Sequence, residues 1–273
     1  TDNTLFTSLA SSSTDNLSVY GYKSSELSAS VGTRFQQYEN LYFSPTLATS
    51  FETLKTTANA SDAKKKQKGN YKDLKFNYNL DYDLRNQRYQ TSDGFRNVFY
   101  QELPLISESY EVVNQFQSTF YKKLIPSSDM IGRISLYAKA VNTLSDKDVR
   151  LSNRLYIPTA KLRGFEAGRV GPKDNDEYIG GNYITAVNFS STLPQILPSF
   201  QNLDISFFVD TANVWGVDYD SSIDDSTKIR SSTGLAMDVL TPIGPLNFSF
   251  SRPITKASTD VTESFRFNLG TTF

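Results

Sequence analysis

The sequence has no cysteine and no histidine among its 273 residues. Without cysteine there are no disulfides, no thiolate metal ligands and no thiol nucleophiles. Without histidine, the commonest general base and the commonest transition-metal ligand are both missing. These absences exclude Ser-His-Asp and Cys-His catalysis and histidine-based zinc sites, whereas carboxylate chemistry has to be judged by motif.

The sequence also lacks an excess of positive charge and a long apolar run. The 28 Lys and Arg residues balance 29 Asp and Glu, so no basic face for a nucleic acid is expected. No stretch approaches 18 consecutive apolar residues, and residues 1–16 lack the charged-then-apolar start of a signal peptide. A membrane-spanning β-barrel is still allowed, because its strands need only about 9–11 residues of alternating character.

Aromatic residues are abundant, at 13%, although only 38% of the chain is hydrophobic. They alternate with polar residues, most clearly over residues 76–84, where every even position is apolar or aromatic. A period of two predicts strands with one apolar and one polar face. The pattern predicts twelve such strands, near residues 4–14, 24–35, 40–54, 71–84, 94–104, 108–122, 130–142, 181–193, 201–215, 228–240, 245–254 and 262–273.

Short, turn-like connections alternate with long polar ones along the chain, as in a transmembrane barrel. The alternative, a soluble β-sandwich, would use shorter strands and a core rich in Val, Ile and Leu. The apolar face here is instead rich in Phe and Tyr, and no composition break marks a second domain. We therefore predict an all-β fold with a single domain over residues 1–273, a transmembrane antiparallel β-barrel.

The longest polar connection, residues 143–180, is rich in glycine, and polar connections of this length tend to be functional. Within it, Arg163 lies between apolar neighbours, which suits a guanidinium that meets a carboxylate. Taken alone, an arginine in such a segment is more often a surface residue. Two other charged segments, the lysines of residues 64–68 and the acidic residues 218–225, are predicted to be solvated loops.

Four groups of motifs follow one another along the chain. They are Leu162-Arg163-Gly164-Phe165 with Val170-Gly171-Pro172-Lys173 and Gly180-Gly181-Asn182, then residues 207–215, 241–246 and 265–273. In this order they resemble a known family, the outer-membrane protein assembly factors of the BamA superfamily. The first group resembles the signature loop of that family, and looser similarity upstream covers a turn motif at residues 83–94, with Gln90 where a proline is common.

The resemblance implies specific site residues. It implies that residues 143–180 form an extracellular loop that folds back into the barrel lumen, where Arg163 meets Asp210 on the inner wall. The position where the family often has a second acid aligns with Ser190. The loop's signature residues would be Arg163, Gly164, Phe165, Gly171 and Pro172.

The resemblance also implies a function: folding and insertion of other β-barrels into the Gram-negative outer membrane, without enzymatic chemistry, cofactor or metal. Its partners would be the lipid bilayer, unfolded β-barrel clients and assembly-complex lipoproteins. The last strand would form one side of a lateral seam. The residues assigned to it are Phe265, Phe267, Gly270 and Phe273.

Family barrels have sixteen strands and periplasmic POTRA (polypeptide-transport-associated) domains before them, so the chain is expected to be truncated at its N-terminus and to hold twelve of the sixteen. Three alternatives stay open: a passive outer-membrane porin or channel, a sister-branch translocator (a two-partner secretion transporter or a TamA-like factor), and a soluble β adhesin.

Overall fold

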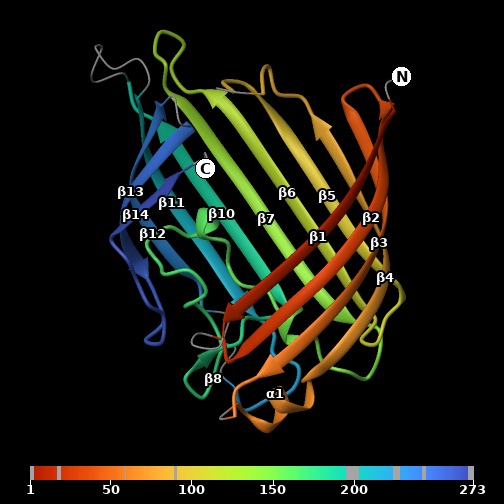
Figure 1. Ribbon diagram of the computed structural model, residues 1–273. Helices are drawn as coiled ribbons and strands as arrows, with labels where there is room; N and C mark the ends of the chain where they lie inside the picture. Colours follow the sequence, from red (N-terminus) through yellow and green to blue (C-terminus); the bar gives the residue numbers. More distant parts are fainter. Residues whose placement is uncertain are drawn as a thin grey trace.

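The computed structural model describes residues 3–16, 20–58, 60–88, 91–194, 203–223, 228–241 and 244–269. Twelve strands form one antiparallel sheet in which neighbours follow chain order (Figure 1). They are β1 (Thr4–Asn16), β2 (Tyr22–Tyr38), β3 (Leu41–Thr56), β4 (Gly69–Asp83), β5 (Gly94–Ile106), β6 (Glu111–Lys123), β7 (Ile131–Thr143), β10 (Tyr183–Thr192), β11 (Leu203–Trp215), β12 (Arg230–Thr241), β13 (Gly244–Thr255) and β14 (Phe265–Leu269).

The predicted all-β barrel fold and its twelve strands are confirmed. Strand bounds differ from the predicted ones by no more than about three residues, apart from the end of the last strand, because residues 270–273 lie outside the described part of the chain. Figure 1 shows tilted strands that curve into the wall of a barrel. The edge strands are β1 and β14, and within the described residues they do not pair with each other.

The outer face of the sheet is apolar and exposed. Phe51 on β3 and Phe250 on β13, for example, expose 50% and 53% of their surface. So much exposed apolar surface is unusual in water but is expected where the strands meet lipid. Further exposed apolar side chains are Leu27, Val31, Leu47, Phe116, Phe120, Ile134, Leu136, Val187, Phe189, Phe207, Leu235, Phe265, Phe267 and Leu269.

The hydrophobic core lies inside the curved sheet, between the strand wall and the segment that joins β7 to β10. Here the structure differs from the expected polar inner face, because the inner face of β7, β10 and β11 is apolar where that segment packs against it. The wall contributes Tyr137, Val141, Ile184, Ala186, Ala212 and Val214, and the segment contributes Val149, Leu155, Ile157, Leu162, Phe165 and Val170.

The long connections gather at one end of the sheet, where β3 and β4 are joined through a short helix, α1 (Asp62–Lys66). Strand alternation did not predict this helix. Ser61 caps it by accepting a hydrogen bond from the Lys64 backbone N–H. The prediction of a solvated lysine run is wrong for Lys64, which is fully buried and pairs with Glu177 and Asp174.

No helix in the described part of the chain is both long enough and apolar enough to span a membrane.

The outer face can be tested with one substitution at two depths. Phe116 and Phe120 on β6 are similarly exposed, at 42% and 44%, but Phe120 lies nearer the strand end. We expect Phe116→Arg to lower the free energy of unfolding in lipid vesicles by about 2–4 kcal/mol and Phe120→Arg by about 0–1 kcal/mol, because the cost of a buried cation depends on depth. Equal costs in urea titrations would contradict a lipid-facing β6, and alanine at both positions controls for loss of the ring.

Candidate functional site

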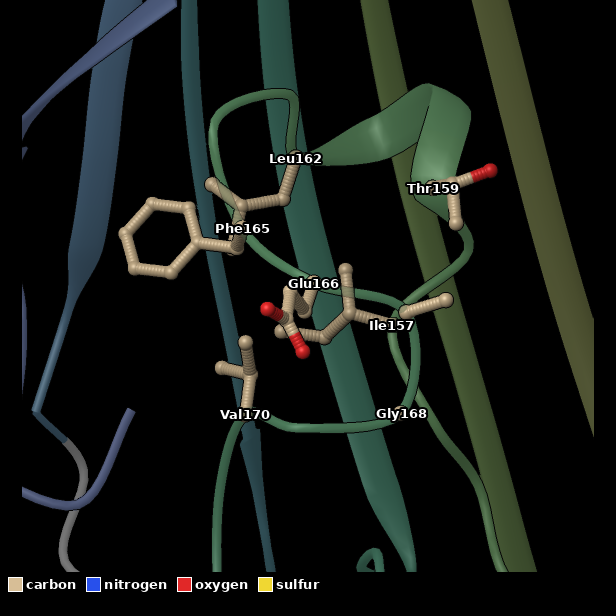
Figure 2. Close-up of a pocket in the computed structure, with 8 residues that line it drawn as sticks. Ile157, Thr159, Leu162, Phe165, Glu166, Gly168 and Val170 are labelled. Carbon is tan, nitrogen blue, oxygen red and sulfur yellow. The ribbon is translucent and has the colours of Figure 1, made fainter. Parts of the chain in front are cut away.

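The inward loop (residues 144–182) joins β7 to β10 and lies inside the curved sheet (Figure 1). It contains two short 3₁₀ turns, η1 (Leu151–Asn153) and η2 (Thr159–Lys161), and a small hairpin of β8 (Lys173–Asp174) and β9 (Glu177–Tyr178). Figure 2 shows Ile157, Leu162, Phe165 and Val170 among the residues that line a small space within the loop. The volume of this space is about 10 Å³. The loop therefore has a packed apolar interior and no room there for a ligand.

Arg163 forms a two-pronged ion pair with Asp210 on the inner face of β11. Its Nε donates to Oδ2 at 2.7 Å and its Nη2 to Oδ1 at 2.8 Å, while the Arg163 backbone N–H also donates to Oδ2 at 3.1 Å. Asp210 is fully buried and Arg163 is 6% exposed. Parallel hydrogen bonds of this kind fix orientation as well as adding energy, so the pair sets the position of the loop on the wall.

Phe208 explains a break in the alternation of β11. It is an aromatic residue on the inner face, where the alternation predicts a polar residue, two residues before Asp210, and it is fully buried. The Arg163 guanidinium carbon lies 3.5 Å from the centre of its ring. The Arg163 guanidinium thus stacks on the face of the inward Phe208 ring while its N–H groups donate to Asp210.

The preceding strand supplies an amide to this site instead of a second acid. Asn188 lies opposite Asp210 in the β10–β11 register, and its Nδ2 donates to Asp210 Oδ1 at 2.9 Å and to the Lys161 carbonyl at 2.8 Å. Ser190, at the expected position, lies opposite Phe208. The ion pair therefore contains one carboxylate, and the neutral Asn188 joins it to the loop backbone.

Two signature glycines allow the loop to approach the wall closely. Gly164 has φ +88°, and a Cβ there would lie 3.2 Å from the Cβ of Ser251 and 3.3 Å from that of Ser232. Gly171 has φ +108°, and a Cβ there would lie 2.5 Å from Val214 Cγ1. Both the backbone conformation and the space favour glycine. Pro172 is buried beside Gly171, and its carbonyl accepts the Ile179 N–H at 3.1 Å.

The inward loop also binds the chain that leads into the last strand. The Glu166 N–H donates to the Val261 carbonyl at 3.0 Å, and the Glu263 N–H donates to the Gly164 carbonyl at 3.1 Å. Phe165 is 2% exposed, and its carbonyl accepts from Arg266 Nη2 of β14 at 2.7 Å. The Arg-Gly-Phe stretch is therefore connected to β11 through a side chain and to the start of β14 through its backbone.

The residues assigned to the seam are described only in part. Phe265 and Phe267 lie on the outer face of β14, with 48% and 49% of their surface exposed. Gly270 and Phe273 lie outside the described residues.

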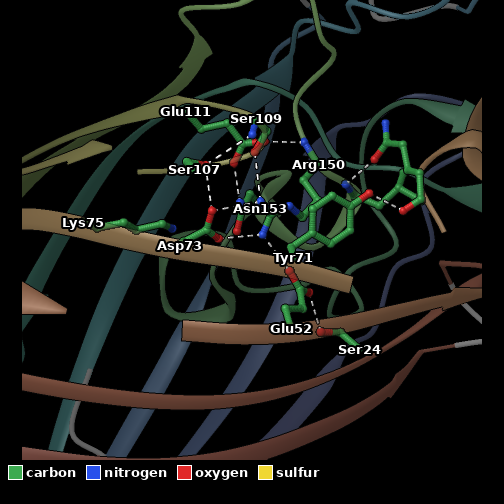
Figure 3. A network of polar contacts seen from close by, with 12 residues as sticks. Ser24, Glu52, Tyr71, Asp73, Lys75, Ser107, Ser109, Glu111, Arg150 and Asn153 are labelled. Carbon is green, nitrogen blue, oxygen red and sulfur yellow. Dashed lines mark hydrogen bonds and ion pairs between the residues drawn. The ribbon is translucent and has the colours of Figure 1, made fainter. Parts of the chain in front are cut away.

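A second arginine of the loop, Arg150, was not singled out from the sequence. Figure 3 shows it among carboxylates of three strands. Its Nη1 donates to Glu52 on β3 and to Asp73 on β4, both at 2.9 Å, and its backbone N–H donates to Glu111 on β6. The guanidinium carbon also lies 4.0 Å from the Tyr71 ring centre. No motif marked Arg150, because its partners are distant in sequence and only the barrel brings them together.

Asp218 anchors the two ends of the inward loop. It pairs with Arg154 and accepts hydrogen bonds from the Val149 N–H and from Asn182 Nδ2, both at 3.0 Å. Burial alone would raise the pKa of the Asp218 carboxyl, but Arg154 and the two donors hold it below its usual value. Asp218 is an exposed residue, as predicted for a solvated acidic loop, but the sequence did not indicate that its carboxylate binds the inward loop.

Lys161 lies beside the ion pair, and its amine has a lowered pKa. Its Nζ donates to Ser135 Oγ at 3.3 Å and lies 5.3 Å from the Tyr137 ring centre. Burial, helped by the nearby positive charge of Arg133, lowers the pKa of Lys161 to about 8, although Asp210 opposes the shift.

The described ranges contain no group of three or more His, Cys, Asp or Glu residues that could hold a metal ion.

The chain was compared with known proteins. Residues 2–273 match the Omp85 superfamily domain. The chain belongs to the Omp85 superfamily. This membership and the barrel strands place it in the bacterial outer membrane, as the sequence predicts.

Curated relatives of this Omp85 chain include outer membrane protein assembly factors BamA. That of Neisseria meningitidis is 33% identical over 141 residues, covering 41% of this chain and 17% of the relative. That of Neorickettsia risticii is 27% identical over 150 residues, covering 53% and 20%. A SAM50-like protein of Schizosaccharomyces pombe is 28% identical over 151 residues, covering 51% and 31%. The chain thus matches less than a third of the length of each of these three relatives.

Two solved structures show the same fold. BamA from Haemophilus ducreyi, lacking POTRA domains 1–3, superposes with a TM-score of 0.88 at 22% identity, covering 97% of this chain and 58% of that one. CdiB from Acinetobacter baumannii superposes with a TM-score of 0.57 at 14% identity, covering 91% and 42%. The resemblance inferred from the motifs, a BamA-like barrel, is confirmed.

The Omp85 ion pair can be tested by protease accessibility. We expect Asp210→Ala to release the inward loop, because removing one partner of a buried ion pair costs about 3–5 kcal/mol and leaves Arg163 without its carboxylate. Trypsin should then cut faster after Lys161, Arg163 and Arg169. Asp204→Ala, on the same strand and polar face, is the matched control. An unchanged rate of tryptic cleavage in Asp210→Ala would contradict the conclusion that the Arg163–Asp210 pair holds the inward loop on the wall.

The lowered pKa of Lys161 makes a second prediction. The folded protein should hold fewer protons than the unfolded chain between about pH 8 and the ordinary lysine value of 10.5, so this residue adds stability as the pH rises through that window. Competitive labelling of lysines with a trace of an amine-reactive reagent should give a labelling rate for Lys161 whose midpoint lies near pH 8. The same labelling in denaturant should move the midpoint upward, and a folded-state midpoint above about 10 would contradict the burial argument.

Proposed function

We propose that the chain is the barrel portion of an outer-membrane insertase, which folds other β-barrel proteins and inserts them into the bacterial outer membrane. The physical problem is the edge of an incoming strand. Each backbone N–H or C=O left unpaired in hydrocarbon costs several kcal/mol. A partner that offers its own free strand edge would satisfy those groups while the client closes, which is strand addition to a sheet.

The observation that carries this proposal is the construction of β14. It is an edge strand of five described residues, whose entry is held to the inward loop by the backbone bonds of Gly164 and Glu166. Its outer face presents Phe265, Phe267 and Leu269 to lipid. An anchored entry and a free edge suit a strand that pairs with a client and then releases it.

The proposal includes parts beyond this chain. The curated BamA relatives are much longer than the segment matched here. We propose that four further strands and periplasmic POTRA domains precede residue 1 in the complete protein, and that the seam lies between the first of those strands and β14. The partners would be unfolded β-barrel clients, the bilayer and assembly-complex lipoproteins. The work would be strand exchange, without a cofactor or a catalytic residue.

A second candidate is translocation of a polypeptide through the barrel, because the CdiB fold is also similar. The insertase is favoured because two of the relatives that match by sequence are named assembly factors and because the inward loop fills part of the barrel interior. A passive channel is disfavoured by the same packed loop.

Because the chain has no cysteine, single introduced cysteines can report on the seam. Asn268→Cys lies on the edge strand β14, and its matched control, Asn77→Cys, lies on the internal strand β4. The complete protein would be placed in liposomes with a urea-unfolded β-barrel client that carries one cysteine in its last strand. We expect the client to fold faster than in empty liposomes and, when a mild thiol oxidant is added, to form a disulfide with Asn268→Cys only.

Three outcomes would contradict the proposal. Client folding no faster than in empty liposomes would contradict the insertase activity. Equal cross-linking at both cysteines would contradict a seam at β14. A large steady ion conductance without client folding would favour the passive channel.

A further inference from the structure

A second polar site lies far from the inward loop, at the end of the sheet where the connections are short. It is a cavity of about 560 Å³ on the inner face of β2 to β5, and we call it the arginine cavity. Its charged lining residues are Arg34, Asp81, Asp83, Arg85, Arg88 and Arg96. Four guanidinium groups face two carboxylates, so the lining carries a net charge of about +2.

Both carboxylates are already occupied. Asp81 accepts from Arg96 Nε at 2.8 Å and Nη2 at 2.9 Å, and from Arg34 Nη2 at 3.2 Å. Asp83 accepts from Arg85 Nε at 2.8 Å and Nη2 at 2.7 Å. These pairs hold three arginines in place, but they cannot neutralise the whole cavity.

Arg88 is an exposed residue that contacts Arg85 through its backbone carbonyl. Its carbonyl accepts from Arg85 Nη1 at 3.4 Å, whereas its side chain forms no ion pair with any described residue. A guanidinium has five N–H donors in a planar fork that matches a carboxylate. Arg88 therefore offers a guanidinium that pairs with no carboxylate of the described chain, whereas Arg34 is shared between Asp81 and the Tyr42 ring.

We propose that the arginine cavity binds an acidic polypeptide segment, through at least two of its carboxylates. The lining is polar apart from the ring of Tyr42, so a ligand would be held by charge and not by apolar contact. The strand residues that line the cavity alternate with the exposed apolar ones, so the cavity lies on the face opposite the lipid-facing side chains, which favours a polypeptide over a lipid headgroup. Its volume is within the range of ligand-binding pockets and large for a single small anion.

This inference is independent of the proposed insertase function, because it uses no residue of the inward loop or of β14. A failed client-folding assay would leave it standing, and a failed peptide-binding assay would leave the insertase proposal standing.

The test uses a fluorescent hexapeptide of glutamate and the folded protein in detergent. We expect saturable binding by fluorescence anisotropy, weakened at high salt because the contacts are electrostatic. Peptides of glutamine and of lysine with the same length and label should not bind. Comparable binding of the lysine or glutamine peptide would overturn the proposal, as would inorganic phosphate that competes as effectively as the glutamate peptide.

Three variants make the test specific to this cavity. Arg88→Gln should weaken binding about threefold to fivefold, which is the scale of one exposed ion pair. Asp83→Asn should strengthen binding, because it removes a competing carboxylate and frees Arg85. Lys123→Gln removes the same charge from the same end of the sheet, outside the cavity, and should change nothing.

Unchanged affinity in both Arg88→Gln and Asp83→Asn would overturn the proposal. Retention of the heat-sensitive mobility of a folded barrel on electrophoresis checks that each variant is folded.

Discussion

The Arg163–Asp210 ion pair is the interaction on which the interior of this barrel depends. A charge buried inside protein is costly unless it is paired, and here the cost is offset in three ways: by the two-pronged geometry with Asp210, by the Phe208 ring beneath the guanidinium, and by Asn188, which occupies Asp210 from the other side. Because the backbone N–H of Arg163 also reaches Asp210, the pair fixes main chain as well as side chain.

The rest of the inward loop follows from that anchor and from a second one. Arg150 fastens the beginning of the loop to β3 and β4, while Arg163 fastens its middle to β11. Between them the loop buries its apolar side chains against the inner face of β7, β10 and β11. The ion pairs of Arg150 and Arg163 orient the loop, whereas its apolar side chains account for most of the surface that it buries against the wall. The interior is therefore partly a conventional hydrophobic core, enclosed by a wall whose outer face is also apolar.

The loop connects the anchor to the sheet edge. Gly164 adopts a positive φ and lies close to Ser232 and Ser251, which a residue without a side chain does most easily, and its carbonyl accepts from the Glu263 N–H. The next residue, Phe165, receives Arg266 of β14. A contact at β11 is thus continued, through three consecutive residues of the loop, to the entry of the last strand. This continuity is the physical basis for relating the loop to the proposed seam.

The sequence by itself determined the sheet. Alternation over residues such as 76–84 is a local property with a period of two, so it specified twelve strands, their faces and the lipid-facing side. Ordered motifs also specified Arg163 and Asp210. The tertiary structure alone decided the rest. Alternation could not show why Phe208 points inward, that Asn188 and not Ser190 touches Asp210, or that Arg150, Lys64 and Asp218 are held in ion pairs. The register of β10 and β11 places Asn188 opposite Asp210. The ion pairs join residues tens of positions apart, and only closure of the loop against the curved wall brings their charges within hydrogen-bonding distance.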